Sequence, residues 1–240
     1  MSNTPDRALI WGFGDVAAGV GGIAWDLGEP GALLLSKGAV QPATFAIEEG
    51  GDATVLELTG EDDTLEATLS PQMGLVHQAG EGNPMGFSAI SCLAEVRSKG
   101  GSQTFQCSGQ TTRWESRFLM GAGTLRHLAI QNGDAQVIAT SRGEPGAGHG
   151  EEHSSGWLLG GEGASYEETL ISTQYDSSGE PTRIGLELWP PDADQSTRAG
   201  ATRVTGSLLG AARMDQTWAG LFRCHSDGTE GLGSYVLWRE

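Results

Sequence analysis

Glycine constrains the fold of this chain more than any other residue, because 38 of its 240 residues are glycine. That share is about twice the usual one in soluble proteins. Glycine destabilises helix interiors, and the longest stretch free of both glycine and proline covers only residues 164–178. This stretch is rich in Thr, Ile, Tyr and Ser, which favour strands. The sequence therefore leaves little room for long helices and favours short strands.

Hydrophobic and polar residues alternate with a period of two, as in strands with one buried face, at residues 44–48, 65–69 and 183–188. Turn sequences rich in Gly, Asn and Asp separate such segments. They lie at residues 49–52, 132–134, 178–181 and 227–228. We therefore predict an all-β protein of antiparallel barrels or sandwiches, since closing a sheet removes its exposed edges.

Two segments allow more than one interpretation. Residues 165–168 spell a helix capping box, so that a short helix could follow, but Ile171, Thr173 and Tyr175 alternate towards a turn and favour a strand. Residues 98–102, Ser-Lys-Gly-Gly-Ser, could link an N-terminal half (1–98) to a C-terminal half (103–240). The same five residues could equally form a hairpin tip.

The charge balance excludes several partners. The chain has 14 Lys and Arg against 31 Asp and Glu, a formal net charge of −17. Nucleic acids and anionic membranes bind through basic residues, so neither is an expected partner. No apolar run is long enough for a membrane span, and residues 1–15 lack the pattern of a secretion signal. Three cysteines without a Cys-x-x-Cys pair suggest reduced, buried thiols, and we expect a soluble, cytoplasmic protein.

The C-terminal part carries a series of motifs in a characteristic order. Residues 156–163 read Gly-Trp-Leu-Leu-Gly-Gly-Glu-Gly, and further motifs follow at residues 175–181, 202–207 and 226–233. The series resembles the second half of an actinobacterial family related to the carotenoid hydratases (hydroxyneurosporene synthase) and to lipocalin-like cyclases of natural-product pathways. The resemblance implies two lipocalin-like antiparallel β-barrels packed together. It also implies a small hydrophobic ligand, terpenoid or polyketide in kind.

The chain departs from the pattern of that family in its polar residues. Hydratase-like members carry Gly-x-Gly-x-Arg-Asp-His-Ser-Trp-Gly before the Gly-Trp motif, but residues 108–115, at that distance, lack the Asp-His pair. Residues 148–156 form a degenerate copy that puts Glu152 in the Asp position, closer to Gly156 than the family pattern. Residues 234–236 stand where the family usually keeps a Glu. The resemblance therefore implies the fold more strongly than the catalysis.

The acidic cluster His149-Gly-Glu-Glu-His153 is the main catalytic candidate. Two imidazoles four residues apart could bind zinc from a helix, but the glycines prevent that helix, so we expect no metal. No motif calls for an organic cofactor, so we expect none. The segment lies in a Gly-rich stretch, residues 143–163, of a length that usually covers or builds a site. If it folds over a barrel mouth, Glu152 and His153, with Glu151 beside them, could protonate an alkene or relay a proton to water. The alternative is a solvated acidic loop.

Aromatic residues could line a lipophilic pocket. The chain has seven tryptophans, of which Trp11, Trp114 and Trp157 lie beside Gly-rich or polar segments and are the ligand-binding candidates, with core packing as the alternative for each. Asp15 completes this set, although its Gly-rich context equally suits a turn. That context does not predict a phosphate loop, because no Lys-Ser/Thr and no helix follow. The single histidines 77, 127 and 225 suit surface or hydrogen-bonded core positions, and no Gly-x-Ser-x-Gly nucleophile motif occurs.

These observations lead to one functional hypothesis and two alternatives. The first is a β-barrel that binds a small hydrophobic molecule and cyclises, isomerises or hydrates it. The second is a non-catalytic carrier or sensor with the same cavity, favoured by the missing Asp-His pair. The third is a structural β-sandwich without a ligand, for which a filled barrel interior would be the sign. A homodimer is compatible with each.

Overall fold

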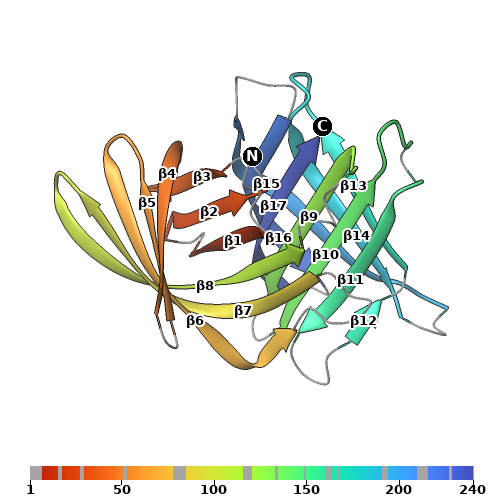
Figure 1. The fold of residues 1–240 in the computed structure, drawn as a ribbon, viewed down its shortest axis with the longest axis horizontal. Coiled ribbons are helices and arrows are strands. Elements are labelled where there is room, and N and C mark those ends of the chain that lie inside the picture. Colours follow the sequence, from red (N-terminus) through yellow and green to blue (C-terminus); the bar gives the residue numbers. More distant parts are fainter. Residues whose placement is uncertain are drawn as a thin grey trace, which may run out of the picture. The chain divides into compact units, whose positions relative to one another are not determined.

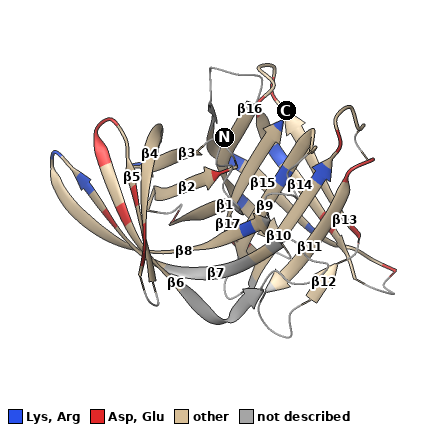
Figure 2. Ribbon diagram, in the orientation of Figure 1, with Lys and Arg blue, Asp and Glu red and all other residues tan. Residues whose placement is uncertain are grey.

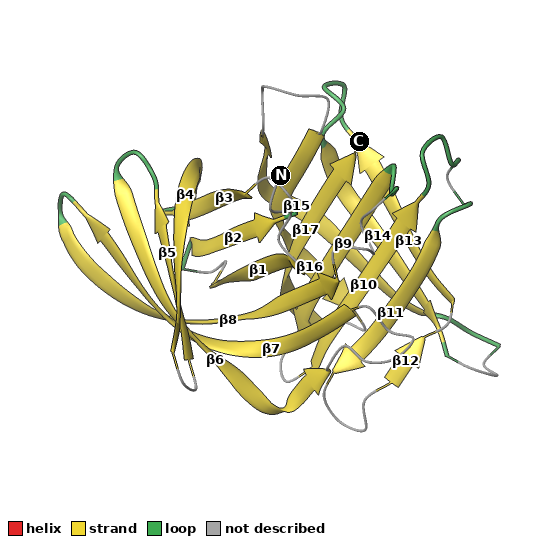
Figure 3. Cartoon of the chain, viewed as in Figure 1, coloured by secondary structure: helices red, strands yellow, loops and turns green. Residues whose placement is uncertain are grey.

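The computed structural model describes residues 7–15, 18–27, 30–50, 53–77, 85–115, 121–132, 135–148, 150–159, 164–166, 168–190, 194–209, 216–226 and 229–239. These residues form strands and turns, and no helix occurs among them (Figure 3). The predicted all-β class is confirmed. The chain divides into two compact units, Met1–Met120 and Gly121–Glu240, which are described separately.

The first unit is a closed barrel whose described strands pair antiparallel in chain order (Figure 1). They are β1 (Arg7–Asp15), β2 (Val20–Asp26), β3 (Pro30–Ser36), β4 (Ala39–Gly50), β5 (Ala53–Thr59), β6 (Asp63–His77), β7 (Met85–Ser98) and β8 (Gly101–Glu115). Strand β8 returns to β1, where Trp11 is the register partner of Thr111, and so closes the barrel.

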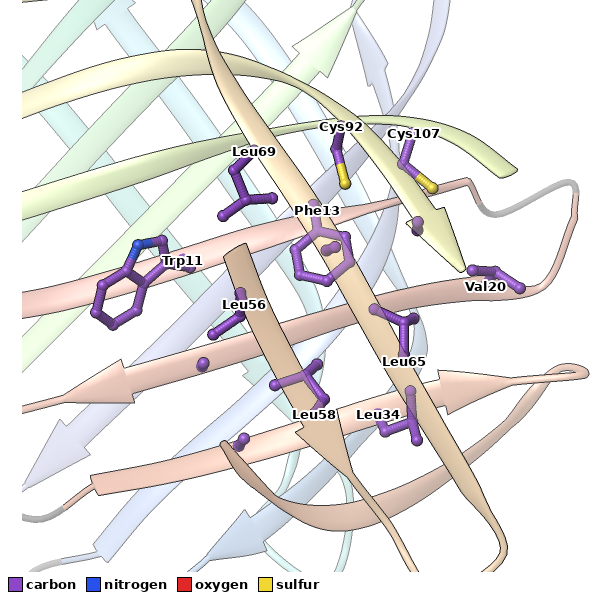
Figure 4. Close-up of a cluster of buried hydrophobic side chains, with 14 of the residues drawn as sticks. Trp11, Phe13, Val20, Leu34, Leu56, Leu58, Leu65, Leu69, Cys92 and Cys107 are labelled. Atoms are coloured by element: carbon purple, nitrogen blue, oxygen red, sulfur yellow. The ribbon is translucent and has the colours of Figure 1, made fainter. Parts of the chain in front are cut away.

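Alternating side chains pack into a cluster inside this barrel. Trp11 and Phe13 of β1, Leu34 of β3 and Leu56 and Leu58 of β5 belong to one buried cluster (Figure 4). Cys92 and Cys107, which are direct register partners on β7 and β8, lie in the same cluster. All three cysteines of the chain are buried, as expected for packing thiols.

The second unit is a nine-stranded antiparallel sheet in the order β12-β11-β10-β9-β17-β16-β15-β14-β13. Its strands are β9 (Thr124–Asn132), β10 (Ala135–Gly143), β11 (His153–Leu159), β12 (Ala164–Tyr166), β13 (Glu168–Tyr175), β14 (Pro181–Trp189), β15 (Thr197–Leu209), β16 (Gln216–Ser226) and β17 (Thr229–Arg239). The sheet curls until its ends approach each other, since a Cβ on Gly156 of β11 would meet Thr169 of β13 and Leu188 of β14. The unit is therefore a nearly closed barrel.

The structure distinguishes between the interpretations of the two ambiguous segments. Ser98 and Gly101 are register partners at the end of the β7–β8 ladder, so residues 98–102 form a hairpin tip. Along the chain, the boundary between the two compact units falls between residues 120 and 121, whereas the expected boundary was at residues 98–103. Strands β7 and β8 belong to one barrel because they are hydrogen-bonded neighbours. Residues 164–166 and 168–175 are strands, which confirms the strand interpretation over the short helix.

Charge is distributed unevenly over the strands. Figure 2 shows acidic residues on β4 and β5 of the first unit and basic residues within several strands of the second unit. No helix in the described part of the chain has the length and apolar character needed to cross a membrane.

Candidate functional site

A buried ion pair lies inside the second barrel, near one end of it. Arg126 alternates with Leu128 and Ile130 on β9, and this alternation places its side chain on the interior face. Glu152 directly precedes β11, two strands away from β9. The guanidinium holds both carboxylate oxygens, with Nη2 2.9 Å from Oε1 and Nη1 donating to Oε2 at 3.0 Å. Each side chain is only 10% exposed.

Ser141 of β10 completes this cluster, since its hydroxyl donates a hydrogen bond to Glu152 Oε2. Ser141 is the register partner of Arg126, so the β9–β10 ladder brings the two side chains to the same face. Two N–H donors and one O–H donor thus occupy the carboxylate. The geometry suits Glu152 to holding Arg126 and Ser141 in place, and it leaves the carboxylate poorly placed to deliver a proton.

Tyr235 of β17 is a second polar group of the interior. It is fully buried, and its hydroxyl lies 3.0 Å from Thr173 Oγ1 of β13, with either oxygen able to donate. Burial raises the pKa of Tyr235 above its usual value, and the charges of Arg126 and Glu152 act on the phenol in opposite directions. A phenol that stays protonated beside a compensated ion pair is a hydrogen-bond donor in an apolar barrel.

Two further buried groups point to an occupant. Thr169 Oγ1 and Trp218 Nε1 have no hydrogen-bond partner among the described residues, although Thr169 is 8% and Trp218 2% exposed. Trp218 belongs to the apolar cluster of this barrel, and Thr169 alternates with Ile171, a member of the same cluster. An unsatisfied buried donor costs about 1–3 kcal/mol. Water or a ligand with an oxygen atom would remove that cost.

The other members of the predicted acidic cluster lie elsewhere. Glu151 is exposed and closes a turn, since its Oε2 accepts a hydrogen bond from the Gly148 amide at 2.8 Å. His153 is exposed at the start of β11, and His149 lies outside the described residues. Among Glu151, Glu152 and His153, only Glu152 joins the buried cluster. No three His, Cys, Asp or Glu side chains of the described residues gather as metal ligands would.

The predicted ligand-binding residues do not form one group. Trp11 packs inside the first barrel, with its ring centroid 6.1 Å from that of Phe45. Trp114 is also buried, but the ladder places it on the opposite strand face from Trp11. Asp15 accepts a hydrogen bond from the Ala18 amide at 3.1 Å. Trp157 of β11 is half-buried, and alternation directs it away from the interior face, which its neighbour Gly156 occupies.

The sequence analysis did not select Arg126, Ser141 and Tyr235. Arg126 carried a signal, because it is a charged residue within a largely apolar segment, residues 125–130. Tyr235 lies within residues 234–236, where the related hydratases usually carry a Glu. This difference from the family pattern could have marked it as a candidate polar group. Ser141 had none, because a serine is ordinary on either face of a strand.

Comparison with solved structures identifies the fold. No protein-family model matches the chain, and no curated protein matches it. A Nitrosomonas europaea protein assigned as AttH aligns with 12% identity and a TM-score of 0.67, over 96% of this chain and 90% of that one. Kievitone hydratase from Nectria haematococca aligns with 10% identity and a TM-score of 0.67, over 100% and 91%. CghA in complex with Sch210972 aligns with 8% identity and a TM-score of 0.61, over 98% and 89%.

The chain has the two-barrel fold of these proteins. The alignments cover nearly the whole of each chain, so the likeness extends over both units. At such low identity the likeness concerns the fold and carries no residue roles. The all-β fold of two antiparallel barrels that the resemblance implied is confirmed.

Proposed function

We propose that the second barrel binds a small hydrophobic molecule that carries an oxygen atom, and that Tyr235 polarises this oxygen. The observation that carries the proposal is the fully buried Tyr235 hydroxyl, 3.0 Å from Thr173 Oγ1, on the interior sheet face that also carries the Arg126–Glu152 pair. The unpartnered Thr169 hydroxyl and Trp218 indole N–H would supply further hydrogen bonds to the ligand. Supporting fold neighbours include one named as a hydratase and one solved with a bound compound.

Each group has a separate part in the proposed chemistry. The apolar walls hold the hydrocarbon part of the ligand, and the Tyr235 O–H donates a hydrogen bond to a carbonyl oxygen. This bond withdraws electrons from a conjugated carbon–carbon double bond, which then accepts water or closes a ring. The Arg126–Glu152 pair supports the site electrostatically and fixes Ser141. The reaction is a hydration, an isomerisation or a cyclisation that needs no external cofactor.

A carrier without catalysis is the second candidate. The Glu152 carboxylate, which already binds two N–H donors and one O–H donor, favours it, since no other acidic group of the predicted cluster points into the interior. A carrier would use the same hydroxyl and indole groups for binding only. The two candidates differ in whether Tyr235 affects turnover or affinity alone.

The first experiment is native mass spectrometry of freshly purified protein, followed by solvent extraction and identification of any small molecule. A bound lipophilic compound with an oxygen function would support the site and supply a substrate class for assays. An apo mass together with no fluorescence response to Nile red would contradict both candidates.

The second experiment separates the candidates with Tyr235→Phe, which removes only the hydroxyl. The enzyme hypothesis predicts loss of turnover of about 100-fold with affinity nearly retained, since one general acid or electrophile contributes on that order. The matched control is Tyr166→Phe, another buried tyrosine of the same apolar cluster. Equal activity of both variants would contradict a catalytic part for Tyr235 and favour the carrier.

A further inference from the structure

The first barrel has its own cavity at the end where three hairpins meet. The turns β1–β2, β3–β4 and β7–β8 surround a cavity of about 280 Å³. The hairpins are tied together there, because the Gly38 amide donates to the Gly19 carbonyl at 3.1 Å and Lys37 Nζ donates to Ser98 Oγ at 3.4 Å. The cavity is thus part of a fixed arrangement of turns.

The walls of this cavity are apolar below and polar at the rim. Val20, Val96 and Phe105 form the apolar part, and Val20 and Val96 also belong to the buried cluster beneath it. Figure 4 shows Val20 in this cluster. Ser98 and Gln103 of the β7–β8 hairpin contribute polar groups to the wall, and Ser102 also lines it while its side chain is hydrogen-bonded to Glu95. The cavity therefore suits a molecule with an apolar body and one polar end.

A buried hydroxyl in the cavity has no partner. Ser36 Oγ forms no hydrogen bond among the described residues, although Ser36 is only 4% exposed. Ser36 alternates with Ala32 and Leu34, which face the interior, so its side chain is directed inward as a lining residue. Such a donor is costly to leave unpaired, and a ligand oxygen would satisfy it.

Lys37 places a positive charge at the rim. It is the one described non-glycine residue with a positive φ, 52°, a conformation that L-residues adopt at a cost. Its ammonium lies 3.9 Å from Asp63, at the limit of an ion pair, and its side chain is 70% exposed. The chain contains two lysines in all, Lys37 and Lys99, and both lie on hairpins at this end of the barrel.

The neighbouring acids are already engaged. Asp15 accepts a hydrogen bond from the Ala18 amide, and Asp62 binds Lys99 at 3.0 Å. Asp63 pairs with Lys37 only through a long contact of 3.9 Å. The Lys37 ammonium has three N–H donors, so it can bind a further anion beside Ser98 and Asp63.

We propose that this cavity, which we call the hairpin pocket, binds a small amphipathic carboxylate. The apolar chain lies on Val20, Val96 and Phe105, and the carboxylate reaches Lys37 at the rim. Ser36 donates a hydrogen bond to a ligand oxygen. The cavity volume is about nine times the volume that one water molecule occupies in the liquid. It therefore suits a ligand of about ten non-hydrogen atoms. This site belongs to the first unit and is independent of the function proposed for the second.

The test uses sodium octanoate, which has about ten non-hydrogen atoms, and follows the titration by amide NMR of the full chain. We expect a dissociation constant in the millimolar range or below, with the largest shifts at residues 36–37 and 98–103. Octylammonium, of the same length and opposite charge, is expected to bind more weakly. No shifts with octanoate, or shifts centred on residues 126 and 235, would overturn the proposal.

Variants identify the groups that bind. Lys37→Gln is expected to weaken octanoate binding about fivefold, as loss of an exposed charge contact does. Lys99→Gln is the matched control, because Lys99 lies at the same end of the barrel on the β7–β8 hairpin, pairs with Asp62 and does not line the cavity. Equal weakening by both variants would show a general charge effect and contradict the proposal.

The Ser36→Ala variant distinguishes a ligand-binding role of Ser36 from a structural one, because stability and octanoate binding should change differently. It removes an unpartnered buried hydroxyl, so the free protein is expected to be as stable as the parent or more stable, while octanoate binds more weakly. A variant that is destabilised yet binds octanoate normally would show that Ser36 is a structural residue and would contradict its part in the site.

Discussion

At the scale of single residues, Arg126 and Glu152 depend on each other. A buried charge without its partner is strongly destabilising, whereas removal of both charges is often tolerated. We predict that Glu152→Leu lowers the free energy of unfolding by about 3 kcal/mol, and that Arg126→Leu/Glu152→Leu is more stable than this single variant. Urea unfolding measures both.

The control for this prediction is Glu144→Gln. Glu144 lies 3.6 Å from Arg142, but its side chain is 71% exposed, so its loss should change stability little. If the double variant were as unstable as the single one, the uncompensated charge of Arg126 would not be the cause.

His127 is the residue that should make stability depend on pH. It is fully buried, its Nδ1 lies 3.2 Å from Thr140 Oγ1, and burial lowers its pKa to about 3. The unfolded chain therefore binds one more proton than the folded chain between about pH 3 and 6.5, so stability falls as the pH falls through this range. From pH 7 to pH 5.5 the loss amounts to about 1 kcal/mol.

The measurement is urea unfolding of the parent and of His127→Gln at both pH values. The variant should lose about 1 kcal/mol less than the parent on acidification, whatever its stability at pH 7. His225→Gln is the control, because His225 is exposed and pairs only loosely with Glu230, at 3.8 Å. An unchanged pH dependence in His127→Gln would contradict the buried neutral imidazole.

At the scale of strands, glycines make room for large rings. Gly206 of β15 and Gly220 of β16 are register partners, and a Cβ on either would lie 2.1–2.3 Å from an atom of the Trp218 ring. The indole thus lies across a pair of glycines. Gly31 leaves the same kind of space for Trp25 in the first barrel. The high glycine content therefore serves packing within strands as well as turns.

This arrangement predicts opposite effects for two alanine substitutions in one strand. Gly206→Ala should lower the free energy of unfolding by about 1–3 kcal/mol, because the new methyl group forces the Trp218 ring to move. Gly200→Ala, also on β15, meets nothing within 4 Å and should be neutral or stabilising by about 0.5 kcal/mol. Thermal unfolding of the two variants is the measurement. Equal effects would mean that ring packing is not what selects glycine at 206.

At the scale of the whole molecule, residues 98–102 can be tested as a hairpin tip within one barrel against a linker between two halves of the chain. We predict that a protease site inserted between Gly100 and Gly101 can be cut without separating the fragments. The reason is that the β7–β8 ladder, from Met85–Trp114 to Ser98–Gly101, keeps its hydrogen bonds. Size-exclusion chromatography under native conditions would show one peak. Two separable folded fragments would instead support the linker interpretation.

The sequence by itself determined the secondary structure class. Period-two alternation depends only on neighbouring residues, and glycine-rich turns act locally, so strands and hairpins follow from short segments. Consecutive paired strands flank each of the four expected turns: β4–β5, β9–β10, β13–β14 and β16–β17. Residues 51–52, 133–134 and 227–228 of these turns lie outside the described residues. The choice of Glu152 was also local, because it rested on an acidic cluster in a loose segment.

Only the tertiary structure decided which distant residues meet. Strand β9 lies between β10 and β17, and this order brings Arg126, Ser141 and Tyr235 to one interior face although they come from three segments of the chain. The pairing of β1 with β8 likewise depends on barrel closure, which no local pattern encodes. Ion pairing and burial are properties of these neighbours in the sheet, so Glu152 acquired its partners only when β9, β10 and β11 paired side by side.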